Sequence, residues 1–219
     1  MSNKSHQQLN IERFDQLAAN WDESPVRAGI ARGVIDSLSQ QIALRGDMDV
    51  LDYGCGTGLV AFSIAPKLNQ LVAVDSSDGM LAVVRDKAQE LGVNNVTALN
   101  LDLSADLSRD ATLEQRFDLI YTSMTMHHIA DTAGILARFF ELLKPGGQLA
   151  IIDLDSEDGS FHGDMPGIAH QGFDRAALQQ LAEEAGFSKL HTKTAHVVSR
   201  DWGDGVRDFP LFIMVGERT

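Results

Sequence analysis

The sequence has little cysteine, little basic charge and no long apolar run, and each shortage excludes a class of protein. Its 219 residues include a single cysteine, Cys55, so neither an intrachain disulfide nor a cysteine-only zinc site can form. The 18 Lys and Arg residues are outnumbered by 31 Asp and Glu residues, and the net charge of −13 disfavours a nucleic-acid partner. No run reaches the roughly 18 apolar residues of a membrane span, and MSNKSHQQLNIERF has no apolar signal-peptide core. We therefore expect no nucleic-acid or membrane partner, and a cytoplasmic location.

From Met48 onward, short β-prone runs alternate with helical patterns. The expected strands are 48–53, 70–74, 95–100, 117–122 and 147–153. The expected helices between them are 57–68, 77–91 and 132–143, with a turn or short helix near 104–115. Helices are also expected at 7–20, 25–44 and 174–185, and a closing antiparallel hairpin at 187–198 and 208–217. This alternation, with nearly continuous apolar strands, predicts an α/β fold with a parallel sheet covered on both faces.

A glycine-rich turn separates the first expected strand from the helix that follows it. In VLDYGCGTGLVAF, Gly54, Gly56 and Gly58 stand at every second position, although glycine weakens both neighbouring elements. A turn of this kind at the end of a parallel strand predicts a ligand cradle. The dinucleotide fingerprint G-x-G-x-x-G fails because position 59 is Leu, which disfavours a nicotinamide oxidoreductase.

The next strand ends at Asp75, about 20 residues beyond the turn. A carboxylate in that place can accept hydrogen bonds from both hydroxyls of a ribose. Together, the turn and Asp75 favour a ligand that contains a nucleoside but no pyrophosphate. Cys55, inside the turn, is interpreted as a small filler residue and not as a nucleophile.

Five segments, in this order, resemble the class I S-adenosylmethionine-dependent methyltransferases: VLDYGCGTG, VAVDSSDGML, NLDL, FDLIYTSMTMHHI and LKPGGQLAIIDLD. Small-molecule enzymes of the quinone-biosynthesis type are the most similar group, and the resemblance covers about residues 10–190. It implies a Rossmann-like, seven-stranded sheet in the order 3-2-1-4-5-7-6 with the last strand antiparallel. It also implies one domain over 1–219, in four parts: a helical lid (1–45), a cofactor-binding core (46–155), a substrate-side loop (156–173) and a C-terminal helix and hairpin (174–219).

The resemblance implies S-adenosylmethionine as cofactor and assigns a role to each matching residue. Three glycines would approach the methionine portion, Asp52 and the carbonyl of Thr122 would hold its ammonium group, and Asp75 would bind the ribose. Around the adenine, the resemblance implies Ser76, Met80, Asp102 and Leu103. The lid segment FDQLAANWDESP would close over the cofactor with Trp21, where the family usually has Tyr. Other readings stay open: Asp52 or Asp102 as a turn or capping residue, Ser76 and Met80 as helix start and core, and Trp21 as packing.

The acceptor side of such a fold lies beyond the fourth and fifth strands, where histidines gather. His127, His128 and His170 are the candidate catalytic residues, because histidine is the natural base near neutral pH. His127 and His128 could instead cap the turn into the next helix. The same region holds a polar, Gly-rich loop with further carboxylates and His162, but no H-x-x-x-H spacing, so we predict no metal site.

We expect in-line methyl transfer to a small-molecule acceptor. The sequence lacks the Asn/Asp-Pro-Pro-Tyr segment of enzymes that methylate amide or exocyclic amine nitrogens. Two alternatives remain: a protein methyltransferase with an open groove in place of a lidded pocket, and a non-catalytic S-adenosylmethionine-binding module with an occluded acceptor side. The sequence does not distinguish oxygen, nitrogen, sulfur or carbon as the methylated atom, and it leaves the oligomeric state open.

Overall fold

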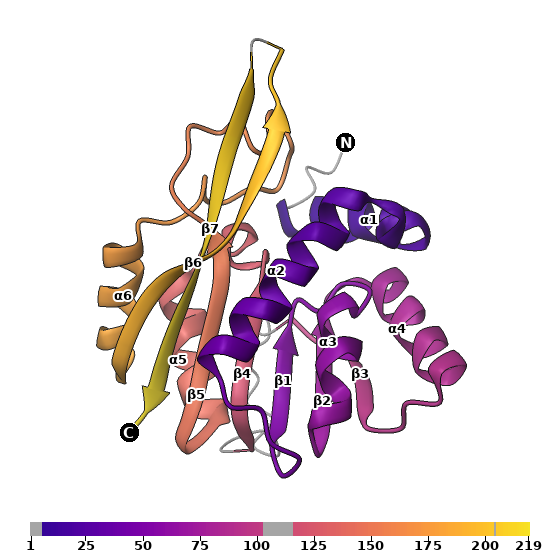
Figure 1. Cartoon of the computed structure of the whole chain (residues 1–219), viewed down its shortest axis with the longest axis vertical. Helices are drawn as coiled ribbons and strands as arrows, with labels where there is room; N and C mark the ends of the chain where they lie inside the picture. The colour runs from indigo at the N-terminus through magenta and orange to yellow at the C-terminus, as the bar shows by residue number, and fades with distance from the viewer. Residues whose placement is uncertain (1–5, 103–115, 204) are drawn as a thin grey trace.

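The computed structural model describes residues 6–102, 116–203 and 205–219, which form an open sheet flanked by helices (Figure 1). The strands are β1 (Asp49–Tyr53), β2 (Gln70–Asp75), β3 (Val96–Asn100), β4 (Phe117–Ser123), β5 (Leu143–Leu154), β6 (Phe187–Asp201) and β7 (Val206–Arg218). The α-helices are α1 (His6–Leu17), α2 (Pro25–Gln41), α3 (Leu59–Ile64), α4 (Asp78–Leu91), α5 (Thr132–Leu142) and α6 (Arg175–Glu184). Short 3₁₀ helices are η1 (Ala18–Glu23), η2 (Ala65–Lys67) and η4 (Met126–His128).

The seven strands lie in the order β3-β2-β1-β4-β5-β7-β6, with β7 antiparallel to both of its neighbours. This confirms the fold expected from the family resemblance. The other pairs are parallel, so the carboxyl ends of β1, β2, β4 and β5 meet at one edge of the sheet. Ligands of open α/β sheets bind at that edge, where the strand order reverses between β1 and β4.

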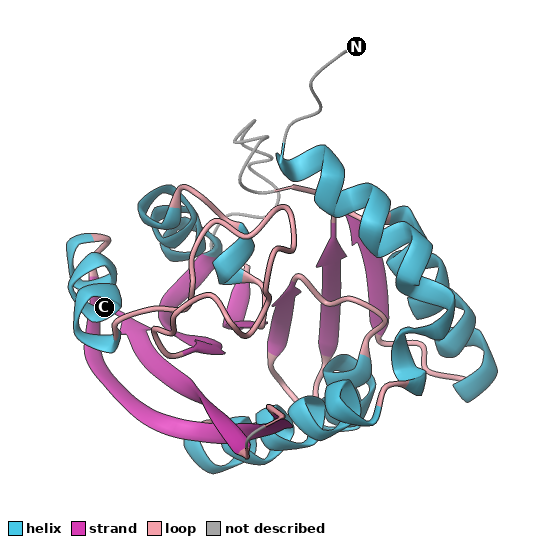
Figure 2. Ribbon diagram, turned by 90° about the horizontal axis from the view of Figure 1, so that it is seen from above, coloured by secondary structure: helices cyan, strands magenta, loops and turns pink. Residues whose placement is uncertain are grey.

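Successive residues of the central strands point to opposite faces of the sheet, and both faces are apolar. Val50 and Leu71 belong to the core cluster that includes residues of α2 and α3, whereas Leu51 and Val72 belong to the one that includes residues of α5 and α6. Figure 2 shows helices on both sides of the twisted sheet. The continuous apolar strands in the sequence therefore reflect a sheet covered on both faces.

The chain departs from the expected boundaries at three places. Helix α2 begins at Pro25 after the N-cap Ser24 as expected, but it ends at Gln41 and not at position 44. Strand β5 begins at Leu143, ahead of the predicted start, because the KPGG segment is a bulge within the strand: the register against β4 jumps from Phe117–Leu143 to Leu119–Gln148. The closing hairpin strands are also longer than expected and project beyond the sheet (Figure 1). The turn or helix expected near 104–115 lies outside the described residues.

The N-terminal helices α1 and η1 contact α4 and close the ligand edge of the sheet. Two carboxylates fasten them there. Asp15 Oδ1 accepts hydrogen bonds from Ser77 Oγ (2.6 Å) and from the amide of Gly79 (2.9 Å). Asp22 accepts a hydrogen bond from the hydroxyl of Thr57 and forms an ion pair with Lys87. None of the helices in the described ranges has the length and apolar character needed to cross a membrane.

Candidate active site

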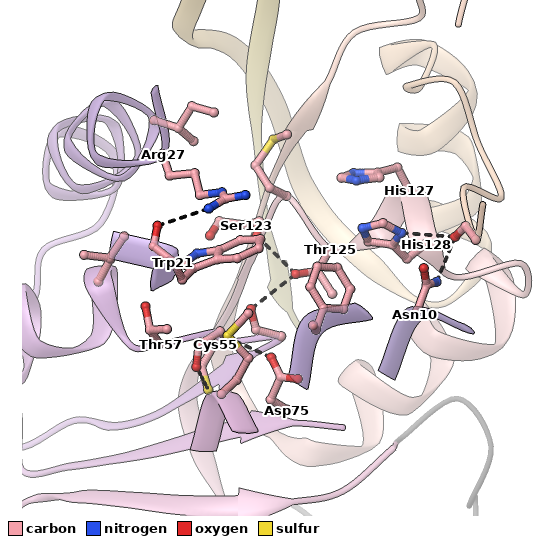
Figure 3. A pocket seen from close by; sticks show the side chains of 18 of the residues that line it. Asn10, Trp21, Arg27, Cys55, Thr57, Asp75, Ser123, Thr125, His127 and His128 are labelled. Carbon is pink, nitrogen blue, oxygen red and sulfur yellow. Dashed lines mark hydrogen bonds between the residues drawn. The ribbon is translucent and has the colours of Figure 1, made fainter. Parts of the chain in front are cut away.

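A cavity of about 1040 Å³ lies over the carboxyl ends of the parallel strands. The glycine turn, the end of β2, the end of β4, α1, η1 and the loop after β5 all contribute to its wall. Its size matches or exceeds the range of about 300–1,000 Å³ typical of small-molecule sites. Figure 3 shows labelled side chains from α1, η1, the glycine turn and the ends of β2 and β4 facing one common space.

Gly54 and Gly56 serve different purposes in the turn. All three of its glycines have positive φ, but a Cβ on Gly54 would lie 2.2 Å from Thr125 Oγ1, whereas a Cβ on Gly56 would meet only Trp21 Nε1, at 3.9 Å. Gly54 therefore permits the close approach of the β4 end. Gly56 is the position where bare backbone faces the cavity, as a ligand cradle requires.

Asp75 is hydrogen-bonded to the backbone of the glycine turn. Its Oδ2 accepts a hydrogen bond from the amide of Gly56 (2.9 Å), and its Oδ1 accepts one from the amide of Ser77 (2.9 Å). Burial raises the pKa of Asp75, although the backbone hydrogen bonds oppose that rise. The carboxylate lines the cavity one strand away from the turn, which is the placement that the sequence predicts for a ribose ligand.

Asp52 lies at the bottom of the cavity and has a partner that the sequence reading missed. Tyr121 Oη donates a hydrogen bond to Asp52 Oδ2 (2.6 Å), and both side chains are buried. Burial raises the pKa of Asp52 to about 7; the Tyr121 hydrogen bond lowers it and the charge of Asp75 adds to the rise. Burial also raises the pKa of the Cys55 thiol, which suits a filler residue better than a nucleophile.

Three of the predicted adenine-side residues, Ser76, Met80 and Asp102, line the cavity, and Leu101 joins them. Leu103 lies outside the described residues. Thr122 is fully buried and does not line the cavity, while the next residue, Ser123, does. The structure thus places Ser76, Met80 and Asp102 on the cavity wall, while the role predicted for the Thr122 carbonyl stays a prediction.

Trp21 lies above the glycine turn, as the lid resemblance implies (Figure 3). Its ring stands edge-on to Phe14, with centroids 5.7 Å apart, and the guanidinium of Arg27 lies 3.8 Å from its centroid. Arg27 Nη1 also donates a hydrogen bond to the carbonyl of Trp21 (3.2 Å). The indole is therefore held in place from two sides.

The acceptor side contains a buried histidine–carboxylate pair. His127 Nδ1 lies 2.7 Å from Asp153 Oδ1, and both side chains are almost fully buried. Burial alone would raise the pKa of Asp153, but the charge and hydrogen bond of His127 and two backbone amides bring it below its usual value. Asp153 is thus an ionised hydrogen-bond acceptor at neutral pH, and it fixes the orientation of the imidazole.

His128 and His162 are neutral neighbours of this pair. The ring centroids of His128 and His162 lie 4.2 Å and 4.6 Å from that of His127. Burial, reinforced by the charge of His127, lowers the pKa of His128 to about 3 and that of His162 to about 4. Since the carbonyl of Gly167 can only accept a hydrogen bond, His128 Nδ1 donates to it (3.1 Å), which leaves Nε2 as the acceptor nitrogen.

His170 does not join the other two predicted catalytic histidines. It lines a separate, smaller cavity under the loop after β5, and its Nε2 lies 2.9 Å from the carbonyl of Ile129 and 3.2 Å from Thr132 Oγ1. The amides of Ala169 and His170 both donate to the carbonyl of His127. The His170 ring is thus hydrogen-bonded away from the main cavity, and its amide ties the loop to His127.

Several charged residues of this region are structural. Asp155 makes a two-pronged ion pair with Arg175 (2.6 Å for each bond), which ties the end of β5 to the start of α6. Across the described ranges, no group of three His, Cys, Asp or Glu residues is arranged to hold a metal ion.

The sequence analysis missed three arginines of the cavity wall, Arg13, Arg27 and Arg200. On α1, α2 and β6 they look like ordinary solvent-facing residues.

A family model described as a methyltransferase domain matches residues 44–199. The chain belongs to this methyltransferase family. S-adenosylmethionine is the methyl donor of the family, and a solved S-adenosylmethionine-dependent methyltransferase from Aquifex aeolicus has the same fold as this methyltransferase. The TM-score is 0.64 at 19% identity, over 99% of this chain and 100% of that one.

Two curated relatives are similar over the core of the methyltransferase. An uncharacterised methyltransferase of Schizosaccharomyces pombe is 31% identical over 156 residues, covering 66% of this chain and 55% of that protein. A ubiquinone biosynthesis O-methyltransferase of Azorhizobium caulinodans is 29% identical over 169 residues, covering 69% of this chain and 64% of that protein. The chain thus spans less than two thirds of the length of either relative.

Proposed function

We propose that this methyltransferase transfers the methyl group of S-adenosylmethionine to a small molecule bound in the cavity. One observation carries the proposal: the glycine turn, Asp75 and His127 line the same cavity, and His127 is backed there by the buried carboxylate of Asp153. Gly56 and Asp75 would hold the cofactor, and Asp52 would face its ammonium group. The bound sulfonium supplies an electrophilic methyl group with a neutral leaving sulfide, so the protein has to position the acceptor and exclude water.

Of the predicted catalytic histidines, His127 is best suited to accept a proton from the acceptor. With Nδ1–H directed at Asp153, its Nε2 carries the lone pair, and the residue lines the cavity. Asp153 stays ionised and would stabilise the imidazolium that forms. His128, whose pKa is lowered to about 3, is too weak a base for this task at neutral pH and would instead accept a hydrogen bond through Nε2.

The lid favours a small-molecule acceptor over a protein. A side chain or loop of a protein substrate would need an open groove, but α1 and η1 are fastened across the site by Asp15 and Asp22. The volume of about 1040 Å³ also speaks against a cofactor-binding module with an occluded acceptor side. The name of the Azorhizobium relative, an O-methyltransferase of ubiquinone biosynthesis, supports the same class of acceptor.

Calorimetric titration with S-adenosylhomocysteine, the product of the donor, tests the cofactor half of this proposal. We expect 1:1 binding to the purified chain and a loss of about tenfold or more in Asp75→Ala and Asp75→Asn. Asp86→Ala, an exposed carboxylate on α4 away from the cavity, is the matched control and should bind as the wild type does. Unchanged affinity in both Asp75 variants, with circular dichroism showing a folded protein, would refute the placement.

A second measurement tests transfer itself. The chain is incubated with S-adenosylmethionine and a panel of small phenols, amines, thiols and activated carbon acids, and methylated product is detected by mass spectrometry. Turnover of a panel member that stops in His127→Asn but not in His191→Asn, a histidine on the exposed surface of β6, supports the proposal. Methylation of proteins in place of any small molecule would favour the alternative of a protein methyltransferase.

A further inference from the structure

Three arginines line the cavity, and in a chain with a net charge of −13 they form a local positive region. Arg13 comes from α1, Arg27 from α2 and Arg200 from β6. None of the three forms an ion pair within the described ranges. Burial lowers the pKa of all three, and the charge of Arg27 lowers that of Arg13 further. Like charges brought together and partly desolvated indicate a missing anion.

Arg13 is the least satisfied of the three. Its Nη1 atom is buried and has no hydrogen-bond partner among the described residues, although its guanidinium lies 5.3 Å from the centroid of the Phe14 ring. Arg27 and Arg200 are each anchored through one Nη1–H, to the carbonyls of Trp21 and Phe161 respectively. Bonding to a neutral carbonyl fixes a guanidinium without compensating its charge. Glu157 raises the pKa of Arg200 but does not outweigh its burial, so both arginines remain available to an anion.

Arg13 and Arg200 lie on the acceptor side of the cavity, whereas Arg27 lies against Trp21. The positive charges of Arg13 and Arg200 both contribute to the lowered pKa of His162, and the ring of His162 is next to that of His127. The carboxylates of the cavity wall lie at or next to the glycine turn, after β3, at the N-cap of α5 and at the exposed tip of the β6–β7 hairpin, and none forms an ion pair with the three arginines within the described ranges. These carboxylates are Asp52, Asp75, Asp102, Asp131 and Asp201.

We propose that the acceptor carries an anionic group, a carboxylate or a phosphate, and that Arg13, flanked by Arg27 and Arg200, binds it. This inference rests on the proposed function, because it names the class of substrate for that site. The cofactor carries a single carboxylate against two positive groups, so it cannot by itself balance three guanidinium groups. An acceptor anion held next to His162 would place the rest of a small acceptor toward His127, where a proton can be taken up.

Calorimetry with two anions tests the inference without knowledge of the natural acceptor. Inorganic phosphate and benzoate are titrated into the protein with and without S-adenosylhomocysteine, and benzamide serves as the neutral counterpart of benzoate. We expect saturable binding of at least one anion and none of benzamide. Arg13→Gln should weaken anion binding about tenfold or more, the effect of losing a charge-assisted hydrogen bond. Arg200→Gln should weaken it too.

The controls separate this inference from the proposed function. Arg32→Gln removes an exposed arginine of α2 outside the cavity wall, so anion binding should stay within about twofold of the wild type. Affinity for S-adenosylhomocysteine should be unchanged in Arg13→Gln. If neither anion binds, or if Arg13→Gln weakens the cofactor product and not the anion, the inference is wrong. Arg13-dependent anion binding by a chain that ignores S-adenosylhomocysteine would overturn the proposed function alone.

Discussion

Tyr121 Oη donates a 2.6 Å hydrogen bond to Asp52 Oδ2 across the boundary between β4 and β1. The two residues are register partners in adjacent parallel strands, so the hydroxyl reaches the carboxylate without any loop. Asp52 is deeply buried and its pKa is raised to about 7 from 3.8. Burial is the main cause of this rise, and the Tyr121 hydrogen bond opposes it by stabilising the ionised carboxylate.

The raised pKa of Asp52 predicts a pH-dependent loss of stability. Because the folded-state pKa lies above that of the unfolded chain, the contribution is favourable below pH 4 or so and is lost as pH rises toward about 7. Asp52→Asn removes this titration. We therefore expect the free energy of unfolding of the wild type to fall more steeply than that of Asp52→Asn over this window, in urea denaturation series. Parallel curves would contradict the assigned pKa.

The complementary variant, Tyr121→Phe, removes the hydrogen bond and keeps the ring. Without it, burial raises the pKa of Asp52 further, and the unpaired buried acceptor costs about 1–3 kcal/mol of stability. If Asp52 binds the cofactor ammonium as a carboxylate, S-adenosylhomocysteine affinity should improve with pH through about 7 in the wild type. In Tyr121→Phe the same rise should occur at higher pH. If the affinity is independent of pH in both proteins, Asp52 does not bind the cofactor as a carboxylate.

Gly54 and Gly92 offer a comparison of two glycines with positive φ. A side chain at Gly54 (φ +75°) meets Thr125, whereas nothing lies within 4 Å of a Cβ at Gly92 (φ +65°). Gly92→Ala should therefore cost only the backbone strain, about 1 kcal/mol. Gly54→Ala adds a steric clash in the turn and should cost more, about 2–4 kcal/mol. Equal losses in thermal unfolding would show that Thr125 moves aside freely.

The individual strands and the glycine turn were predictable from local sequence patterns, whereas the order of the seven strands came from the family resemblance. Apolar strands and an N-cap such as Ser24 depend on residues close to them in the sequence, and Asp75 follows the glycine turn at the spacing that a strand–helix–strand unit gives. The bulge at the start of β5 was not predictable, since it depends on register against β4. The same holds for Tyr121, which looks like any core residue of a strand until β1 lies next to it.

The acceptor side was predictable only in part, for the same reason. His127 and His128 were found by their position after β4, but His170 was separated from them by the path of the loop. Arg13 and Arg200 are 187 positions apart in a chain of 219 residues, and no local pattern predicts that they line one cavity. Three-dimensional placement was needed to show a positive acceptor side in an acidic protein.

The pair His127–Asp153 predicts a separation of catalysis from cofactor binding. Asp153→Asn keeps the volume but removes the charge that orients and stabilises the imidazole. We expect turnover to fall by about 10²–10⁴-fold, the typical contribution of a positioned base, with S-adenosylhomocysteine affinity within about twofold of the wild type. A purely structural role would lower both together. A shifted pH–rate profile in Asp153→Asn and not in His191→Asn identifies the effect as acting through His127.

Asp22 connects the lid to the cofactor side, and its removal tests whether that closure matters. Asp22 accepts from Thr57, next to the glycine turn, and pairs with Lys87 of α4. Asp22→Ala should speed amide hydrogen exchange in residues 8–23 and weaken S-adenosylhomocysteine binding several-fold, because the opened lid no longer holds Trp21 over Gly56. Asp47→Ala, which breaks the exposed pair with Arg45, is the control and should change neither. If the lid exchanges no faster in Asp22→Ala, then Asp15 and the packing of Phe14 hold it closed without Asp22.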